Sequence, residues 1–233
     1  MNNYKKLESG RSMIEMLGVL AIIGVLSVGG IAGYSKAMNK FKTNKVADQV
    51  SMLVANIKTM YAQQNTYEGL SNETAISLGV VPDELVVKTK DESNNEKTEL
   101  LNSFNGPVFI FASDSTSDKD KKAFTIEFNN LSKEACITLA TNDWGSGYSS
   151  GLIALRAAGK SATEATDKLK KVYIGNEGTP GRAEKAGEGG NDNDVIATPG
   201  GKTGARVPLS VTSAAVACGC SAGNTCSLQW KYY

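Results

Sequence analysis

The chain has 233 residues, which is enough for one core domain and an anchoring segment. Its 25 basic and 24 acidic side chains give a net charge of +1, so electrostatics provide no case for a direct nucleic-acid site. The sequence has no histidine, the commonest general base and metal ligand, which excludes most hydrolase triads and zinc enzyme sites. We therefore expect no catalytic residue, no metal site and no cofactor.

The N-terminal region joins a short basic leader to a long apolar run. The leader MNNYKKLESG ends at Gly10, and Glu15 is the only acidic residue between Gly10 and the start of the run. No charged side chain occurs from Met16 through Ser35, so the run is about 20 residues long, or about 30 Å as a helix, which matches the hydrocarbon core of a bilayer. A secretory signal would place its cleavage site after the apolar stretch. Here the small residue at the expected cleavage site, Gly10, lies before the apolar run.

This arrangement resembles the class III leader of type IV prepilins. The resemblance implies that residues 1–10 are a leader removed by prepilin peptidase between Gly10 and Arg11, and that Arg11 is then N-methylated. It also implies that Glu15 pairs with the free amine of Arg11 on a neighbouring subunit and so sets the register of assembly. Many type IV pilins begin the mature chain with an apolar residue, whereas this chain would begin with Arg11.

A purely local interpretation of the same residues is also possible. Ser12 and Glu15 have the spacing of a capping box at a helix N-terminus. Arg11 and Glu15 are four positions apart and could pair within one helix. A carboxylate at a membrane edge is costly and usually has a specific role, which favours the assembly interpretation.

The helix is expected to continue past the apolar run, over residues 11–65, with a transmembrane half at 13–35. In its second half, apolar residues recur every three or four positions, which predicts a stripe that faces a head domain. These residues are Val46, Val50, Leu53, Ile57 and Met60. Several glycines interrupt the first half, and they favour either bending of the helix or close helix packing in the membrane.

Residues 66–140 are expected to form the first part of a globular head. Turn residues, alternation and capping signals predict distinct segments in this region. They are a short helix at 71–79, a solvated loop at 88–99, strands at 107–112 and 124–128, and a short helix from Ser132 that carries Cys136. In the second strand Phe124, Ile126 and Phe128 should face the long helix.

The order of these segments is similar to the head of type IVb pilins of the PilS kind. The similar part covers residues 67–140 and includes a YEGL turn, the NSFNGPV segment, an FTI strand and a KEAC helix. The resemblance implies an α+β pilin fold, in which the long N-terminal helix packs against an antiparallel β-sheet head over residues 66–233.

Beyond residue 141 the expected elements are fewer. Ser161 and Glu164 could form a capping box for a helix that ends near Val172. Residues 175–204 are rich in Gly and polar residues and should form a long exposed loop. Its GGKT sequence is no phosphate-binding loop, because Ile196 stands where the first Gly is required. Strands are expected at 207–211 and 226–233, with a short helix or turn between them.

The four cysteines favour two disulfides in an oxidising compartment. They are Cys136, Cys218, Cys220 and Cys226. A bridge between Cys218 and Cys220 is the least expected pairing, because bridging residues two apart is strained. Cys136 should therefore pair near the C-terminus, where type IVb pilins carry a similar disulfide, and close a loop worth on the order of 4 kcal/mol. A thiolate metal site is disfavoured, because structural zinc sites usually have two C-x₂₋₄-C pairs, whereas here one cysteine, Cys136, is isolated.

The leading hypothesis is a structural subunit of a type IV pilus that serves adhesion, motility or DNA transfer. By resemblance, the precursor would lie in the inner membrane lipid bilayer with its head outside, meet the peptidase and the pilus assembly machinery, and join identical or related subunits in an extracellular fibre. Within the same machinery, a minor pilin or a type II secretion pseudopilin is the alternative. From another class, the alternative is a membrane-tethered extracytoplasmic binding domain or enzyme.

Overall fold

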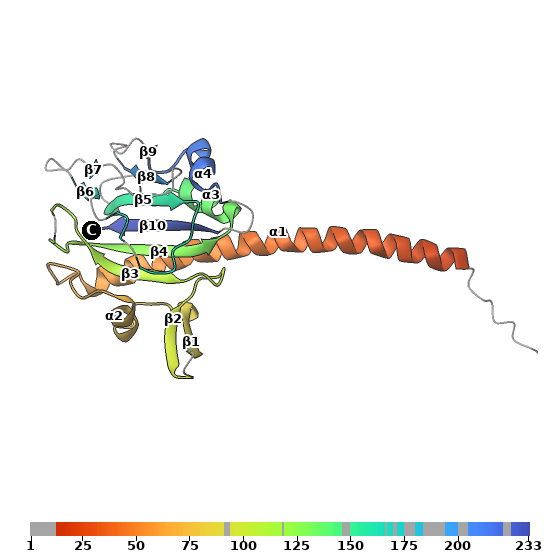
Figure 1. Cartoon of the computed structure of the whole chain (residues 1–233), viewed down its shortest axis with the longest axis horizontal. Coiled ribbons are helices and arrows are strands. Elements are labelled where there is room, and N and C mark those ends of the chain that lie inside the picture. The colour runs from red at the N-terminus through yellow and green to blue at the C-terminus, as the bar shows by residue number, and fades with distance from the viewer. Residues whose placement is uncertain are drawn as a thin grey trace, which may run out of the picture. The chain divides into compact units, whose positions relative to one another are not determined.

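The structure is a computed structural model, and residues 1–12 lie outside the part that it describes. The described residues are 13–90, 94–117, 119–145, 150–165, 167–169, 172–174, 180–183, 194–199, 205–220 and 225–233. The chain divides into two units, residues 1–41 and residues 42–233. The described part of the first unit is wholly helical, and the second unit is an α+β head (Figure 1).

The elements follow one another from a long helix into a mixed succession of strands and short helices. The helical elements are α1 (Met13–Met60), α2 (Asn72–Ser77), the 3-10 turn η1 (Asp83–Leu85), α3 (Lys133–Thr141) and α4 (Val211–Ala217). The strands are β1 (Val86–Lys90), β2 (Glu96–Leu100), β3 (Val108–Ser113), β4 (Ala123–Leu131), β5 (Leu152–Ala158), β6 (Val172–Ile174), β7 (Pro180–Ala183), β8 (Val195–Thr198), β9 (Ala205–Arg206) and β10 (Cys226–Tyr232).

The part of α1 that belongs to the head has one buried face. Val46, Val50, Leu53 and Ile57 are fully buried in the main apolar core, as their spacing predicts. Met60, which was expected in the same stripe, is 46% exposed, because the helix ends at this residue and not at residue 65. The stripe therefore covers three turns of α1.

The head is built on a six-stranded sheet with the order β3-β4-β10-β5-β8-β9 (Figure 1). Its neighbours are antiparallel except for the last pair, β8 and β9, which is parallel. The C-terminal strand β10 lies between β4 and β5, so the end of the chain completes the centre of the sheet. The predicted α+β fold, with the long helix packed on an antiparallel sheet, is confirmed.

The two faces of this sheet differ in chemistry although both are largely buried. The residues that pair across one face are apolar, and they join the core that contains the α1 stripe: Ile110, Ile126, Trp230, Leu155 and Ala197. The next row, on the opposite face, contains Phe109, Glu127, Gln229, Arg156 and Ile196. Alternation along the strands thus places a polar, buried row directly behind an apolar one.

The short helix α2 is attached to the outer edge of the sheet. Ser71 caps α2 by accepting a hydrogen bond from the Thr74 amide, whereas the sequence leaves Ser71 and Asn72 as alternative starts of this helix. The Asn72 side chain then donates to the Val108 carbonyl at 2.8 Å and accepts from the Ile110 amide at 2.7 Å. These bonds satisfy backbone groups on the edge strand β3, which would otherwise be open to pairing with another chain.

Four expectations for the head are wrong in part. Residues 88–99 are not simply a solvated loop, because their described parts lie in the β1–β2 hairpin, whose side chains are largely exposed. Ser161 starts no helix in the described residues. Its hydroxyl accepts from the Asn130 amide and donates to the Cys226 carbonyl, which ties this segment to the sheet. Val172 begins strand β6.

The other two corrections concern the region after residue 175. Part of the expected exposed loop 175–204 is strand β8, which pairs with β5 and buries Ala197 and Thr198. The remaining glycine-rich stretches, 175–179, 184–193 and 200–204, lie outside the described residues. Residues 207–211 form no strand, because Pro208 has no amide to donate and Ser210 instead caps α4. The expected strand at 226–233 is confirmed as β10.

Candidate functional site

The first candidate site is the apolar half of α1. Every side chain from residue 13 to residue 37 is exposed, including Ile14 at 79% and Leu26 at 69%. The helix contains an 18-residue window with a mean hydropathy of 2.2, none of which is buried within the chain. By length and composition this helix can cross a membrane. Its apolar surface has no partner among the described residues of its own chain.

The few polar groups in this half are satisfied within the helix. The Ser27 hydroxyl donates to the Ile23 carbonyl at 2.7 Å, and the Ser35 hydroxyl donates to the Ile31 carbonyl at 3.0 Å. In hydrocarbon, an unsatisfied hydroxyl would be costly, so these local bonds make both serines compatible with a lipid environment.

Five glycines of the apolar half leave open space around the helix. Apart from the adjoining backbone of the helix itself, a methyl group added at any of them would meet no described atom within 4 Å; they are Gly18, Gly24, Gly29, Gly30 and Gly33. No close packing inside the chain therefore requires a glycine at these positions. The helix also remains continuous through all of them.

Glu15 lies in the first turn of α1 and is exposed. A carboxylate at this end of a helix interacts favourably with the partial positive charge of the unpaired backbone amides. Gly10 and Arg11 lie outside the described residues, so the geometry bears neither on cleavage between them nor on a pairing of Glu15 with the Arg11 amine. Those expectations remain predictions.

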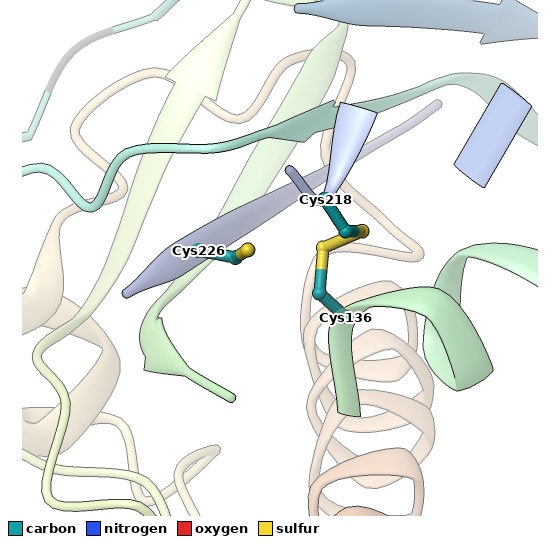
Figure 2. Close-up of side chains that lie close together, drawn as sticks. All are labelled: Cys136, Cys218 and Cys226. Carbon is teal, nitrogen blue, oxygen red and sulfur yellow. A yellow bond between two sulfur atoms is a disulfide. The ribbon is translucent and has the colours of Figure 1, made fainter. Parts of the chain in front are cut away.

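The second candidate site is the group of cysteines at the end of the head. Cys136 on α3 is bonded to Cys218, which follows α4, and Cys220 is bonded to Cys226 at the start of β10. The expectation of disulfide bonds is confirmed. The first bridge spans 82 positions and joins α3 to the region of α4, as Figure 2 shows. A loop of that length corresponds to about 4 kcal/mol of stabilisation in the chain-entropy model.

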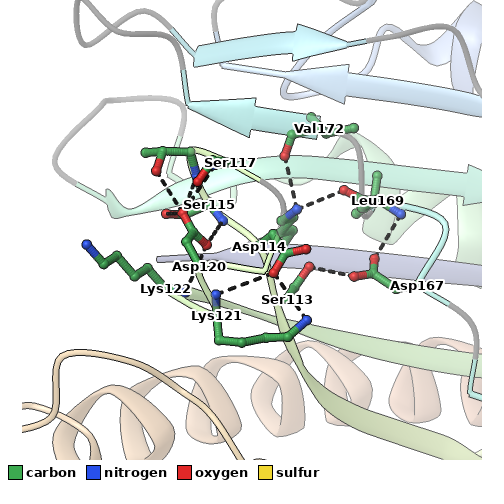
Figure 3. A network of polar contacts seen from close by, with 12 residues as sticks. Ser113, Asp114, Ser115, Ser117, Asp120, Lys121, Lys122, Asp167, Leu169 and Val172 are labelled. Carbon is green, nitrogen blue, oxygen red and sulfur yellow. Dashed lines mark hydrogen bonds and ion pairs between the residues drawn. The ribbon is translucent and has the colours of Figure 1, made fainter.

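Sequence reasoning missed the polar network on the second sheet face. The Lys231 ammonium is fully buried and donates to the Leu169 carbonyl at 2.8 Å and the Val172 carbonyl at 3.0 Å. Asp167 accepts from the Ser113 hydroxyl at 2.6 Å (Figure 3). Lys231 therefore holds the segment before β6 against the sheet. The alternation of β10 places Lys231 on this face, but only the covering segment explains its burial.

Burial controls the pKa values in this network. Desolvation lowers the pKa of Lys231 to about 8, although the charges of Asp167 and Asp114 act in the opposite direction. Desolvation likewise raises the pKa of Asp167 above its ordinary value. Both shifts favour the neutral form of a group that the covering segment removes from water.

The turn between β3 and β4 is organised around one carboxylate. Asp120 accepts hydrogen bonds from the backbone amides of Ser115 and Thr116, both at 2.7 Å, and from the Lys122 amide at 3.1 Å (Figure 3). Burial acts to raise the pKa of Asp120, but these amides stabilise the anion and hold the pKa far below its usual range. The Asp120 carboxylate therefore stabilises the β3–β4 turn.

A hollow of about 470 Å³ opens beside the polar row of the sheet. Its charged lining consists of Glu127, Arg156, Lys160, Glu164, Lys168 and Asp194. Acidic and basic groups are equal in number, and Arg156 is already paired with Asp194, with 3.1 Å between the Arg156 Nε and the carboxylate. The balance of charge favours neither an anionic nor a cationic ligand.

Comparison with known proteins identifies the family. The PilS N terminal family matches residues 40–199, which is more than half of the chain. The chain belongs to the PilS family. This confirms the resemblance to type IVb pilins of the PilS kind. The match covers the second half of α1 and the head as far as β8, while the leader and the apolar run precede it and β9, α4 and β10 follow it.

Relatives of this PilS family chain include named pilus subunits. It is 28% identical over 167 residues to the major structural subunit of bundle-forming pilus from Escherichia coli O127:H6, covering 69% of this chain and 81% of the relative. It is 27% identical over 144 residues to the toxin coregulated pilin of Vibrio cholerae, covering 60% of each chain.

Solved structures similar to this chain are also pilins. A type IVb pilin from Salmonella typhi aligns with a TM-score of 0.44 and 17% identity, over 78% of this chain and 93% of that one. TcpA, a type IV pilin from the Vibrio cholerae El Tor biotype, aligns with a TM-score of 0.48 and 18% identity, over 82% of this chain and 99% of that one.

Proposed function

We propose that this chain is the precursor of a structural subunit of a type IV pilus. Membership of the PilS family supports the proposal, as do the names of its relatives, which are major structural subunits of bundle-forming pilus and a toxin coregulated pilin. Because these relatives are major subunits, they favour a main subunit of the fibre over a minor pilin or a type II secretion pseudopilin.

One observation carries the proposal in physical terms: the apolar half of α1 is exposed on all sides. Burial of apolar surface is worth roughly 25 cal/mol per Å², so a surface of this kind must be covered by something outside the chain. Before assembly the cover is the lipid of the inner membrane. In the fibre it is the same helix of neighbouring subunits, since helices that leave lipid can bury this surface only against one another.

Proteolytic processing converts the membrane-embedded precursor into the subunit that enters the fibre. Prepilin peptidase removes residues 1–10, and the new amine of Arg11, which is N-methylated, pairs with Glu15 of a neighbouring subunit. The assembly machinery of the inner membrane then transfers the subunit into an extracellular fibre. In this scheme the head remains outside the membrane and supplies the surface through which the fibre serves adhesion, motility or DNA transfer.

The experiment that tests the proposal determines the N-terminus of the assembled protein. Mass spectrometry of sheared surface fibres should find a chain that begins at Arg11 and carries one extra methyl group. A Gly10→Val variant should remain full length in the membrane and produce no fibres, whereas the neighbouring Ser9→Ala variant should be cleaved normally. Fibres composed of chains that begin at Met1 would contradict the proposal.

A further inference from the structure

The two disulfides of the head lie against each other. The sulfur atoms of Cys136, Cys218 and Cys226 are all within 4.8 Å of one another, and all three residues are fully buried. Cys226 is nevertheless bonded to Cys220, not to either of the other two. Figure 2 shows the Cys226 side chain directed from β10 toward the Cys136–Cys218 bridge.

Cys220 differs from the other three in its position. Its side chain is only partly buried, and its sulfur is not a member of the group of three mutually close sulfurs. An external thiol can therefore approach the Cys220–Cys226 bridge at the Cys220 sulfur more readily than it can approach Cys136 or Cys218. Attack at Cys220 leaves the Cys226 sulfur as the thiolate, inside the buried group.

We propose that Cys226 exchanges with the Cys136–Cys218 bridge, so that the long-range crosslink of the head moves from α4 to β10 whenever the Cys220–Cys226 bridge is opened. The exchange is internal to the chain, because the sulfurs involved are buried and already in proximity. Nothing in the pilus function requires it, and it stands on the cysteine geometry alone.

The exchange balances without an oxidant. A small-molecule thiolate such as glutathione bonds to the Cys220 sulfur, and the Cys226 thiolate leaves with the electron pair. The Cys226 thiolate then bonds to the Cys136 sulfur, and the Cys218 thiolate leaves and takes a proton from solvent. Each step forms one S–S bond and breaks one, as in any thiol–disulfide exchange.

The new pairing preserves the constraint on the head. Cys136 and Cys226 are 90 positions apart, against 82 for the first bridge, and loop-closure entropy varies only slowly with length. The covalent tie to α3 would then reach β10, the strand between β4 and β5, and α4 would lose its own tie. The head therefore has a long-range crosslink in either pairing, and the exchange changes only whether α4 or β10 is tied to α3.

The test uses a variant in which the Cys226 thiol is free from the start, so no external thiol is needed. In Cys220→Ser, Cys226 has no partner and lies beside the Cys136–Cys218 bridge. The detergent-solubilised full-length chain is held at pH 8, quenched in acid, labelled with N-ethylmaleimide and mapped by mass spectrometry without reduction. We expect label on Cys218 as well as on Cys226, because the bridge has moved in part of the molecules. Label on Cys226 alone would overturn the proposal.

Two further variants keep the test decisive. In Cys226→Ser the remaining thiol is Cys220, outside the close group, so label should stay on Cys220 alone. In Cys218→Ser the Cys136 thiol lies beside the Cys220–Cys226 bridge, and exchange should move label from Cys136 to Cys220. If Cys220→Ser does not fold, the Cys218→Ser variant provides the test. Label confined to Cys136 in that variant would refute the exchange.

Discussion

The two halves of α1 have the same secondary structure but opposite environments. In residues 13–37 every side chain is exposed, and apolar residues surround the helix axis. In residues 42–60 the apolar side chains form one stripe, and Val46, Val50, Leu53 and Ile57 are completely buried by the head. The second half finds its packing partners within the chain, whereas the first half has none among the described residues.

This difference separates two kinds of stability. Substitutions in the second half should change the free energy of unfolding of the head, because they alter contacts inside one molecule. Substitutions in the first half should leave the head intact and instead change membrane insertion or assembly. Each prediction below compares one change with a control that should act on only one of these properties.

The largest expected effect comes from Glu15→Gln. If Glu15 pairs with the amine of a neighbouring subunit, the variant leaves that amine without a counter-charge, which costs roughly 3 to 5 kcal/mol at every such contact. The variant should be made, cleaved and inserted at normal levels but yield few or no fibres by electron microscopy. The thermal unfolding of its head should be unchanged.

The control for this prediction is Glu68→Gln, which removes an exposed carboxylate from the head and should assemble normally. The local alternative for Glu15 predicts a different result, because Gln serves in a capping box as well as Glu does. Abundant fibres from Glu15→Gln, with ordinary subunit spacing, would show that the carboxylate charge does not register the subunits.

A matched pair of leucines tests the second half against the first. Leu53→Ala removes a fully buried side chain from the core and should lower the free energy of unfolding by about 2 to 5 kcal/mol. Leu20→Ala removes an exposed side chain and should leave that free energy unchanged in detergent. Chemical denaturation of the full-length chain, followed by tryptophan fluorescence, measures both. Equal destabilisation by the two variants would remove the distinction between the halves.

The sequence predicted those elements whose signals are local. The stripe on α1 follows from a spacing of three and four, and α2 and α3 begin close to the predicted positions, where Ser71 and Ser132 cap them. Strand β4 was recognised from its alternation. Strand β5 was missed, because both faces of this central strand are buried and its sequence LIALRAA therefore shows little alternation.

The errors after residue 160 have a common cause. Ser161 has the spacing of a capping box, but its hydroxyl is used by a backbone amide 31 positions away, which no local pattern reveals. Likewise the burial of Lys231 depends on covering residues that are distant in sequence, Leu169 and Val172, whose carbonyls accept its hydrogen bonds. The cysteines could be assigned to disulfides from the sequence, but their pairing and the close contact between the two bridges required the fold.

Lys231 provides a smaller test, because the head contains a buried ionisable side chain, whereas every side chain of residues 13–37 is exposed. The pKa of Lys231 is lowered to about 8 in the folded chain, against about 10.4 when unfolded. Between these values the unfolded chain binds more protons, so the free energy of unfolding should rise with pH, by up to about 3 kcal/mol in total.

The measurement is thermal unfolding from pH 7.5 to 9.0, about one unit below the ordinary tyrosine pKa of about 10. Lys231→Met should lose most of the rise with pH, because among the buried lysines only Lys58, whose pKa burial also lowers, still titrates. The exposed Lys90→Met control should keep the rise. A parent chain whose stability is flat or falls over this interval would show that Lys231 is not held neutral by burial.

The smallest expected effect concerns Gly30, where a methyl group would meet no described atom within 4 Å apart from the adjoining backbone of the helix itself. If this glycine permits close approach of neighbouring helices, replacement by Ala should lower the thermal dissociation midpoint of the fibres slightly, and replacement by Leu should lower it much more. If the glycine instead permits bending of the helix, Ala and Leu should act alike. Their helix propensities are similar, and each exceeds that of Gly by on the order of 1 kcal/mol. Because the apolar half has no packing partners among the described residues, we expect the effect to increase with side-chain size while head unfolding stays constant. Equal midpoints for the two variants would assign Gly30 to bending.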